Sequence, residues 1–182
     1  MLRSAGRHSI VIALAVLVCS AASSTASADV TLGWYNLQWP PTINVNLGSP
    51  TDTIYGQVWT QGVTDSPGQG AGILAQVGYG PDGTQPTGPG WNWFAMSYNV
   101  DAGNNDEYSG TFVPTQAGTF DYATRFSGDG GATWSVADLN GPQIDNILDN
   151  PGSLVVVPEP GATALVAAAL GLLSRRRRRD AR

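Results

Sequence analysis

Residues 118–134 read Gly-Thr-Phe-Asp-Tyr-Ala-Thr-Arg-Phe-Ser-Gly-Asp-Gly-Gly-Ala-Thr-Trp, and the fold class follows from this stretch. In an extended chain its aromatic residues share one face, namely Phe120, Tyr122 and Phe126, and the other face carries Asp121, Ala123 and Arg125. This alternation predicts a half-buried β-strand over Gly118–Phe126. The glycine-rich segment that follows predicts a tight turn into a second strand.

Short alternating segments of this kind continue through residues 29–150, and no window there has a helical period. Turn-forming clusters separate them at 65–72, 81–90, 101–106 and 127–132. Seven or eight short strands are typical of an antiparallel β-sandwich, which we expect to be all-β and immunoglobulin-like, with a small barrel as the alternative. The predicted strands are Val30–Trp39, Thr42–Leu47, Thr53–Thr60, Gly72–Tyr79, Trp91–Tyr98, Glu107–Val113, Gly118–Phe126 and Thr133–Leu139.

One predicted strand is apolar on both faces. In Trp91–Tyr98 the two tryptophans Trp91 and Trp93 alternate with Phe94, Met96 and Tyr98. A strand of a sandwich has only one core face. Either the tryptophan pair or the other three side chains should therefore lie outside the core.

The first 28 residues have the three parts of a signal peptide. Arg3 and Arg7 precede an apolar run over 10–19, and the small residues Ala26 and Ala28 mark a cleavage site. We expect signal peptidase to leave residues 29–150 as one exported domain. This domain should rely on its core, because the single cysteine, Cys19, lies in the signal peptide.

The end of the chain combines a proline-rich linker, an apolar segment and a basic tail. We expect a linker over 151–160 that contains Pro158, Glu159 and Pro160, a membrane helix over 161–174 and a cytoplasmic tail over 175–182. The helix would span only about 20 Å, against a bilayer core of about 30 Å. The arginine cluster of the tail comprises Arg175, Arg176, Arg177, Arg178 and Arg179.

This order of Pro-Glu-Pro, short apolar helix and arginine cluster resembles the PEP-CTERM sorting signal. The resemblance covers about residues 157–179. It implies an exosortase partner that cuts at the Pro-Glu-Pro site, a precursor anchored in the inner membrane, and a product at the cell surface or in the extracellular matrix. The alternative is a plain C-terminal membrane anchor.

The charge of the chain is unevenly distributed. Residues 29–157 hold twelve acidic residues and one basic residue, Arg125, and the chain has no lysine. Nucleic acid is therefore not an expected partner, whereas neutral glycans are compatible with this charge. The only histidine, His8, also lies in the signal peptide, which excludes Ser-His-Asp, Cys-His and zinc chemistry in the exported domain.

The turn after the predicted strand Gly118–Phe126 matches a known motif. Ser127, Asp129, Gly131, Thr133 and Trp134 fit the Ser/Thr-x-Asp-x-Gly-x-Thr-Trp pattern of the Asp-box, which it resembles at every defined position. The resemblance implies a structural β-hairpin turn. Asp129 should accept hydrogen bonds from nearby backbone amides, and Trp134 should fold over the turn.

Residues 118–138 are also similar to the final strands of starch-binding modules. The resemblance implies that Trp134 stacks on glucose, although the turn is longer here and a lysine common in those modules is absent. The whole middle region resembles an uncharacterised domain of secreted bacterial proteins. Exposed rings stack on sugar faces, so the candidate glycan-binding residues are Tyr55, Trp59, Trp91, Trp93 and Trp134, the alternative being that these rings fill the core.

One stretch is rich in oxygen ligands. Asp101, Asn104, Asp106 and Glu107 lie within seven residues, and such loops can hold Ca²⁺. The stretch does not follow the EF-hand pattern, because Gly103 stands where an oxygen ligand is needed. We expect a polar turn and no cofactor, with a Ca²⁺ site as the alternative.

Together these observations predict a non-catalytic, exported module that binds a neutral glycan or exopolysaccharide. One alternative is a purely structural matrix protein whose aromatic residues are buried. A remote alternative is a carboxylate glycosidase, which needs two acids about 5–10 Å apart in a groove.

The sorting prediction can be tested at the motif itself. Replacing Pro158, Glu159 and Pro160 by alanine should keep the protein in the membrane, at the size of the precursor less its signal peptide, because the exosortase loses its recognition site. Fractionation and immunoblotting of the host measure this. Normal release of the variant would contradict the prediction.

Overall fold

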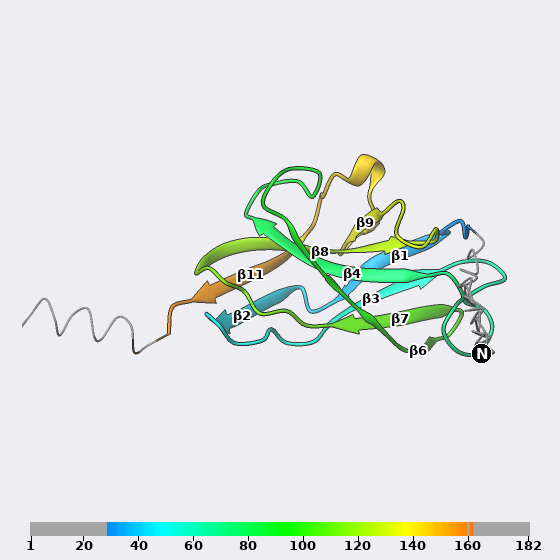
Figure 1. Ribbon diagram of the computed structural model, residues 1–182, viewed down its shortest axis with the longest axis horizontal. Helices are drawn as coiled ribbons and strands as arrows, with labels where there is room; N and C mark the ends of the chain where they lie inside the picture. Colours follow the sequence, from blue (N-terminus) through cyan, green and yellow to red (C-terminus); the bar gives the residue numbers. More distant parts are fainter. Residues whose placement is uncertain (1–28, 160, 162–182) are drawn as a thin grey trace, which may run out of the picture.

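The computed structural model describes residues 29–159 and 161, and this part of the chain is all-β (Figure 1). It contains eleven strands and one short 3₁₀ turn, η1. The strands are β1 (Trp34–Trp39), β2 (Thr42–Asn46), β3 (Ile54–Trp59), β4 (Leu74–Pro81), β5 (Asn92–Ala95), β6 (Ser97–Ala102), β7 (Asn105–Gly110), β8 (Gly118–Ser127), β9 (Ser135–Asp138), β10 (Gly141–Pro142) and β11 (Gly152–Val157), and η1 spans Ile144–Asn146.

The strands form two sheets. The smaller sheet has the order β1-β3-β7-β6, and all its pairs are antiparallel. The larger sheet has the path β10-β9-β8-β11-β2, with β4 and then β5 added on the other edge of β8. Its one parallel pair is that of β11 with β2.

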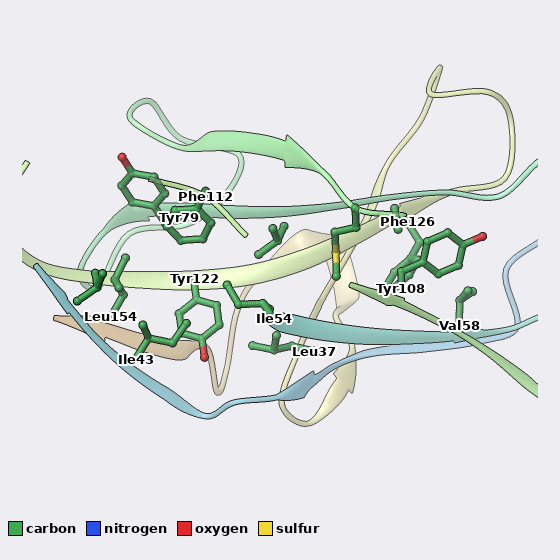
Figure 2. Close-up of a cluster of buried hydrophobic side chains, with 14 of the residues drawn as sticks. Leu37, Ile43, Ile54, Val58, Tyr79, Tyr108, Phe112, Tyr122, Phe126 and Leu154 are labelled. Atoms are coloured by element: carbon green, nitrogen blue, oxygen red, sulfur yellow. The ribbon is translucent and has the colours of Figure 1, made fainter. Parts of the chain in front are cut away.

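The main core lies between the two sheets, as Figure 2 shows for its largest side chains. Tyr108 and Phe126 contact edge to face with 6.1 Å between ring centroids, and Tyr79 stacks on Phe112 at 4.7 Å. Such ring pairs add to the stabilisation from buried area. Leu37, Ile54 and Val58 enter this core from the smaller sheet, and Ile43, Tyr122 and Leu154 enter it from the larger one.

The alternation predicted for Gly118–Phe126 is confirmed in β8, and β3 shows the same period of two. Along β3 the core side chains Ile54 and Val58 are buried, whereas Tyr55, Gln57 and Trp59 are half-buried on the opposite face. Along β8 the aromatic residues face the core, while Ala123 and Arg125 face outward. The period of two in Gly118–Phe126 therefore identified the core face of β8, whereas the structure decided which face of β3 enters the core.

The predicted strand Trp91–Tyr98 is in fact two strands in different sheets. β5 pairs with β4 in the larger sheet, and β6 pairs with β7 in the smaller one. The chain crosses between the sheets at Met96, which is buried in the core. The structure resolves the two faces of this stretch, because Phe94, Met96 and Tyr98 pack into the core whereas the tryptophan pair packs on the outer side of the larger sheet.

The expected linker over 151–160 is wrong for its first part. Residues Gly152–Val157 form β11, which pairs with both β8 and β2. Leu154 and Val156 are buried in the core, at 0% and 2% exposure. A short apolar run cannot by itself be assigned to a linker or a buried strand. Here the run forms a strand because it pairs with the free edges of both β8 and β2. The domain therefore extends to Val157.

The polar turn expected over 101–106 is shorter than predicted. β6 continues through Ala102 and β7 starts at Asn105, so the two strands form a hairpin closed by Gly103 and Asn104. Gly103 has φ +74°, a conformation that glycine adopts without strain.

The signal peptide, the apolar segment 162–174 and the basic tail lie outside the described residues. Within 29–159 and 161, no helix is long and apolar enough to cross a membrane.

The assignment of β11 to the fold can be tested by truncating one buried side chain. Leu154→Ala should lower the free energy of unfolding by about 2–5 kcal/mol, because it leaves a cavity between β8 and β2. Urea denaturation followed by tryptophan fluorescence measures this. Val157→Ala, at a residue that is 42% exposed at the end of the same strand, is the control and should cost less than about 0.5 kcal/mol. Similar small effects for both variants would contradict the role of β11.

Candidate functional site

The outer face of the larger sheet carries a row of aromatic side chains around one cation. We call Trp91, Trp93, Arg125 and Trp134 the tryptophan strip. Trp93 lies on β5 opposite Gly78 of β4, and a Cβ at Gly78 would come within 2.4 Å of the indole. Gly80 is in the same relation to Trp91. Glycines at the outward positions of β4 thus let both indoles rest against the sheet.

The members of the strip contact one another. The rings of Trp91 and Trp93 are nearly parallel, at 23°, with 5.5 Å between centroids. The Arg125 guanidinium carbon lies 4.2 Å from the Trp93 ring centroid and 4.5 Å from that of Trp134. Both distances fall in the range of cation–π attraction. All three indoles are half-buried, so none is lost in the core.

Arg125 is held by a carboxamide. Its Nε and Nη2 donate to Oε1 of Gln76, its register neighbour on β4, with Nε–Oε1 at 2.8 Å. Partial burial lowers the pKa of Arg125, but a guanidinium stays charged in proteins. A pocket of about 140 Å³ is lined by Gln76 and Trp134 together with core residues such as Met96 and Tyr108. The strip thus combines ring faces, a fixed cation and an adjacent hollow.

A second small core supports the strip. Ala123, Val136 and Leu148 are buried on the outer side of the larger sheet, and Trp91 and Trp93 pack against them. The backbone N–H of Leu148 donates to Oε1 of Gln85 at 2.6 Å, which joins the β4–β5 loop to the segment after η1. Figure 1 shows both loops on the same side of this sheet.

The buried carboxylate of Asp138 fixes the segment between β9 and β11. Its Oδ2 accepts hydrogen bonds from the backbone N–H groups of Asp149 and Asn150, at 2.9 and 2.7 Å. Its Oδ1 accepts from the Asn140 backbone and the Gln143 side chain, at 2.8 and 2.7 Å. Asp138 therefore holds the loop that brings Leu148 under the tryptophans.

The Asp-box turn forms as predicted and positions Trp134. Asp129 accepts hydrogen bonds from the hydroxyls of Ser127 and Thr133, at 2.7 and 2.6 Å, and from the Thr133 backbone N–H at 2.9 Å. These bonds hold the pKa of Asp129 well below its usual range, the Thr133 hydroxyl contributing most. Trp134 lies beside Gly131 of the turn and reaches Arg125 on β8.

The candidate glycan-binding residues lie on two opposite faces. Trp91, Trp93 and Trp134 belong to the strip, whereas Tyr55 and Trp59 lie on β3, on the outer face of the smaller sheet. None of the five is buried.

Sequence reasoning did not include Arg125 and Gln76 among the site residues. The signal that could have found Arg125 is its position as the one basic residue of an acidic domain, on the outward face of a predicted strand.

The three carboxylates among the four candidate Ca²⁺ ligands do not form a cluster. Asp101 accepts hydrogen bonds from the Tyr98 hydroxyl and the Gly68 N–H, which lower its pKa. Asp106 is buried and accepts from the Gly70 N–H at 2.6 Å, and burial raises its pKa. Residues 29–159 and 161 contain no group of three or more His, Cys, Asp or Glu that could hold a metal ion. Glu107 accepts a hydrogen bond from the side-chain amide of Asn99. The carboxylates of this hairpin thus have separate hydrogen-bond partners.

The sorting and cleavage residues are only partly within the described chain. Pro158 and Glu159 are exposed and follow β11 directly. Ala26, Ala28, Pro160 and the arginine cluster lie outside the described residues.

Comparison with known proteins shows similarity to segments of large enzymes. The chain is 33% identical over 144 residues to an amylopullulanase of Thermoanaerobacter thermohydrosulfuricus, in a match that covers 70% of this chain and 9% of that enzyme. It is 33% identical over 110 residues to an amylopullulanase of Thermoanaerobacterium thermosulfurigenes, covering 50% of this chain and 6% of the enzyme. A third match, 31% over 114 residues, is to the amylopullulanase of Thermoanaerobacterium saccharolyticum, covering 52% of this chain and 8% of the enzyme. No protein-family model matches the chain. The chain thus spans less than a tenth of each of these relatives.

The Asp129 turn should give stability a specific pH dependence. Because the folded state lowers the pKa of Asp129 below its usual 3.8, its contribution is complete above about pH 5 and fades as the pH falls below about 4. The difference in unfolding free energy between the wild type and Asp129→Asn should therefore narrow as the pH falls below about 4. Denaturation at a series of pH values measures it. Asp52→Asn, which removes an exposed carboxylate outside the turn, is the control. A difference that stays constant down to pH 2 would contradict the assignment.

Proposed function

We propose that the exported domain is a non-catalytic module that binds a neutral glycan of the α-glucan class through the tryptophan strip. The observation that carries the proposal is the strip itself, in which Trp93 and Trp134 flank the fixed Arg125 guanidinium and Trp91 stacks on Trp93, all three indoles being half-buried on the outer face of the larger sheet. Indole faces bury the apolar C–H face of a sugar ring. Arg125 and Gln76 supply polar groups that can orient its hydroxyls.

The relatives suggest the class of glycan. Each is named as an amylopullulanase, an enzyme that acts on α-glucans, and the match covers a small part of each. A short segment of a polysaccharide-degrading enzyme is well suited to be an accessory binding module. We infer the same role for this chain, with amylose-like or pullulan-like glucans, or an exopolysaccharide of similar chemistry, as the ligand.

The use of the carboxylates supports a binding rather than a catalytic role. Asp101, Asp106, Asp121, Asp129 and Asp138 each accept hydrogen bonds from backbone N–H groups of loops. These acids thus serve to anchor loops. The exported domain also has no histidine, cysteine or lysine to act as nucleophile or base. We therefore propose no catalytic residues.

We infer that the scaffold is an immunoglobulin-like sandwich. The order β1-β3-β7-β6 corresponds to the four-stranded sheet of that fold, and β4, β8 and β11 correspond to the strands of the opposite sheet. The first two strands belong to different sheets, because β1 pairs with β3 and β2 pairs in parallel with β11. In this scheme β9, β10 and η1 are an insertion that supports the strip.

We also propose that the chain follows the PEP-CTERM route to the cell surface. What supports this is the position of Pro158 and Glu159, which are exposed and begin directly where β11 ends at Val157. A cut at this site would leave the sheets intact. Signal peptidase and an exosortase are the partners that the route requires.

The strip predicts the effect of a single substitution on glycan binding. Trp134→Ala should weaken binding to pullulan or amylopectin about ten-fold or more, roughly 1.4 kcal/mol, because a ring that covers the sugar is lost. Affinity electrophoresis in gels with pullulan, amylopectin-containing starch, dextran or the exopolysaccharide of the host measures retardation. Val113→Ala, at an apolar residue that is 45% exposed outside both sheets, is the control and should migrate like the wild type.

The same gels decide between the glycan-binding and the purely structural roles. Unretarded migration of the wild type in all of the polymers would rule out glycan binding. Retardation that is unchanged in Trp134→Ala would show that the glycan binds elsewhere on the domain.

A further inference from the structure

The outer face of the smaller sheet carries a second set of aromatic and amide side chains, on the opposite side of the molecule from the tryptophan strip. We call this set the β3 face. Ile54, Gly56 and Val58 are buried, so the intervening residues of β3 point away from the core. The members of the face are Trp34, Asn36 and Trp39 of β1, Tyr55, Gln57 and Trp59 of β3, and Asn105 and Glu107 of β7.

The strand register groups the aromatic residues of the β3 face into two pairs of neighbours, which are not among the ring–ring contacts of the described residues. The strand register sets Trp39 opposite Tyr55 and Trp34 opposite Trp59. Tyr55 and Trp59 are four residues apart on β3, which separates the two pairs by about 13 Å. Trp39 and Trp34 are 59% and 37% exposed, the highest values among the tryptophans of residues 29–159. A Cβ at Gly141 of β10 would lie 3.4 Å from Nε1 of Trp34, so Trp39 is the more open of the two rings.

An amide row lies between the two aromatic pairs. The backbone N–H of Gln57 donates to Oδ1 of Asn36 at 3.2 Å, and Nδ2 of Asn105 donates to Oε1 of Gln57 at 3.0 Å. These bonds fix the amide oxygens. The Nδ2 of Asn36 and the Nε2 of Gln57 donate to no group among the described residues, and Glu107 adds a carboxylate acceptor to the row. The row therefore offers donors and an acceptor at fixed positions.

The chemistry of the β3 face matches an uncharged sugar chain. Rings at both ends can cover C–H faces, and the amides between them can bond hydroxyls. The face has no cation, and its one charge is that of Glu107, so an anionic polymer would be repelled. A second copy of the domain is a poorer occupant, because both copies carry the same large excess of acidic residues.

We propose that the β3 face is a second glycan-binding site, so that one domain holds two neutral polysaccharide chains on its opposite sheets and cross-links them. The proposal rests on the proposed glycan-binding function but uses different residues from the strip. Since the two sheets pack face to face, their outer faces point in opposite directions and each can hold a separate chain (Figure 1). Cross-linking would give a non-catalytic domain a direct mechanical role in a matrix.

Calorimetric stoichiometry separates the two sites. The purified exported protein should bind two maltoheptaose molecules per chain. The double variant Trp39→Ala/Tyr55→Ala and the single variant Trp134→Ala should each bind one with unchanged affinity, the substituted site being weakened about ten-fold or more and so not filled at the same concentrations. Light scattering of amylopectin mixtures should rise with the wild type and stay near baseline with either variant, because each has lost one site. Unfolding midpoints check that the variants are folded. Replacing Trp39 should cost little stability, because this side chain is 59% exposed.

The other outcomes are distinct for the two proposals. One maltoheptaose per chain, lost in Trp134→Ala but kept in Trp39→Ala/Tyr55→Ala, would overturn the second site and leave the strip in place. One maltoheptaose per chain that is lost only in Trp39→Ala/Tyr55→Ala would overturn glycan binding by the strip and the cross-linking, and it would support the β3 face as a site. No binding would overturn both sites. A wild-type dimer in sedimentation that Trp39→Ala/Tyr55→Ala dissociates would show that the face binds a second copy instead.

Discussion

The backbone ladder of β8 is the constraint on which the rest of the structure depends. One edge of β8 pairs with β4 along most of its length, and the other edge pairs first with β11 and then with β9. Its inner side chains, Tyr122 and Phe126, are fully buried between the sheets. Its outer side chain Arg125 is the centre of the tryptophan strip. One strand thus fixes both the core and the candidate site.

Buried and half-buried carboxylates take the role that disulfides have in many small exported domains. Asp106 binds the Gly70 N–H, Asp121 the Gly83 N–H, and Asp138 the backbone of the segment before β11. Hydrogen bonds to a charged acceptor are stronger than neutral ones. The acidic composition is therefore a structural device as well as a source of net charge, and it keeps the loops beside the strip in place.

Several features of the candidate site could be predicted from single residues. The defined positions of the Asp-box predicted the turn at Asp129, and the period of two predicted that Arg125 lies opposite the aromatic face of its strand, whereas the outward position of Tyr55 and Trp59 was left open. The oxygen-rich stretch around Asp106 was misleading, because residue type does not say where each carboxylate points. The Asp106 side chain is buried and accepts a hydrogen bond from the backbone N–H of Gly70, which is 36 residues away in the chain.

The sequence by itself determined the all-β class, the core face of β8, the acid-rich charge and the chemistry that residues 29–157 lack, because these depend on local periodicity and composition. Tertiary structure alone decided that 152–157 is a buried strand, that the chain changes sheets at Met96, and that Trp93 and Trp134 meet at Arg125. It also divided the exposed aromatic residues between two opposite faces. These outcomes depend on pairings between distant segments, and a strand's partners are set by the edges left open elsewhere in the fold rather than by its own residues.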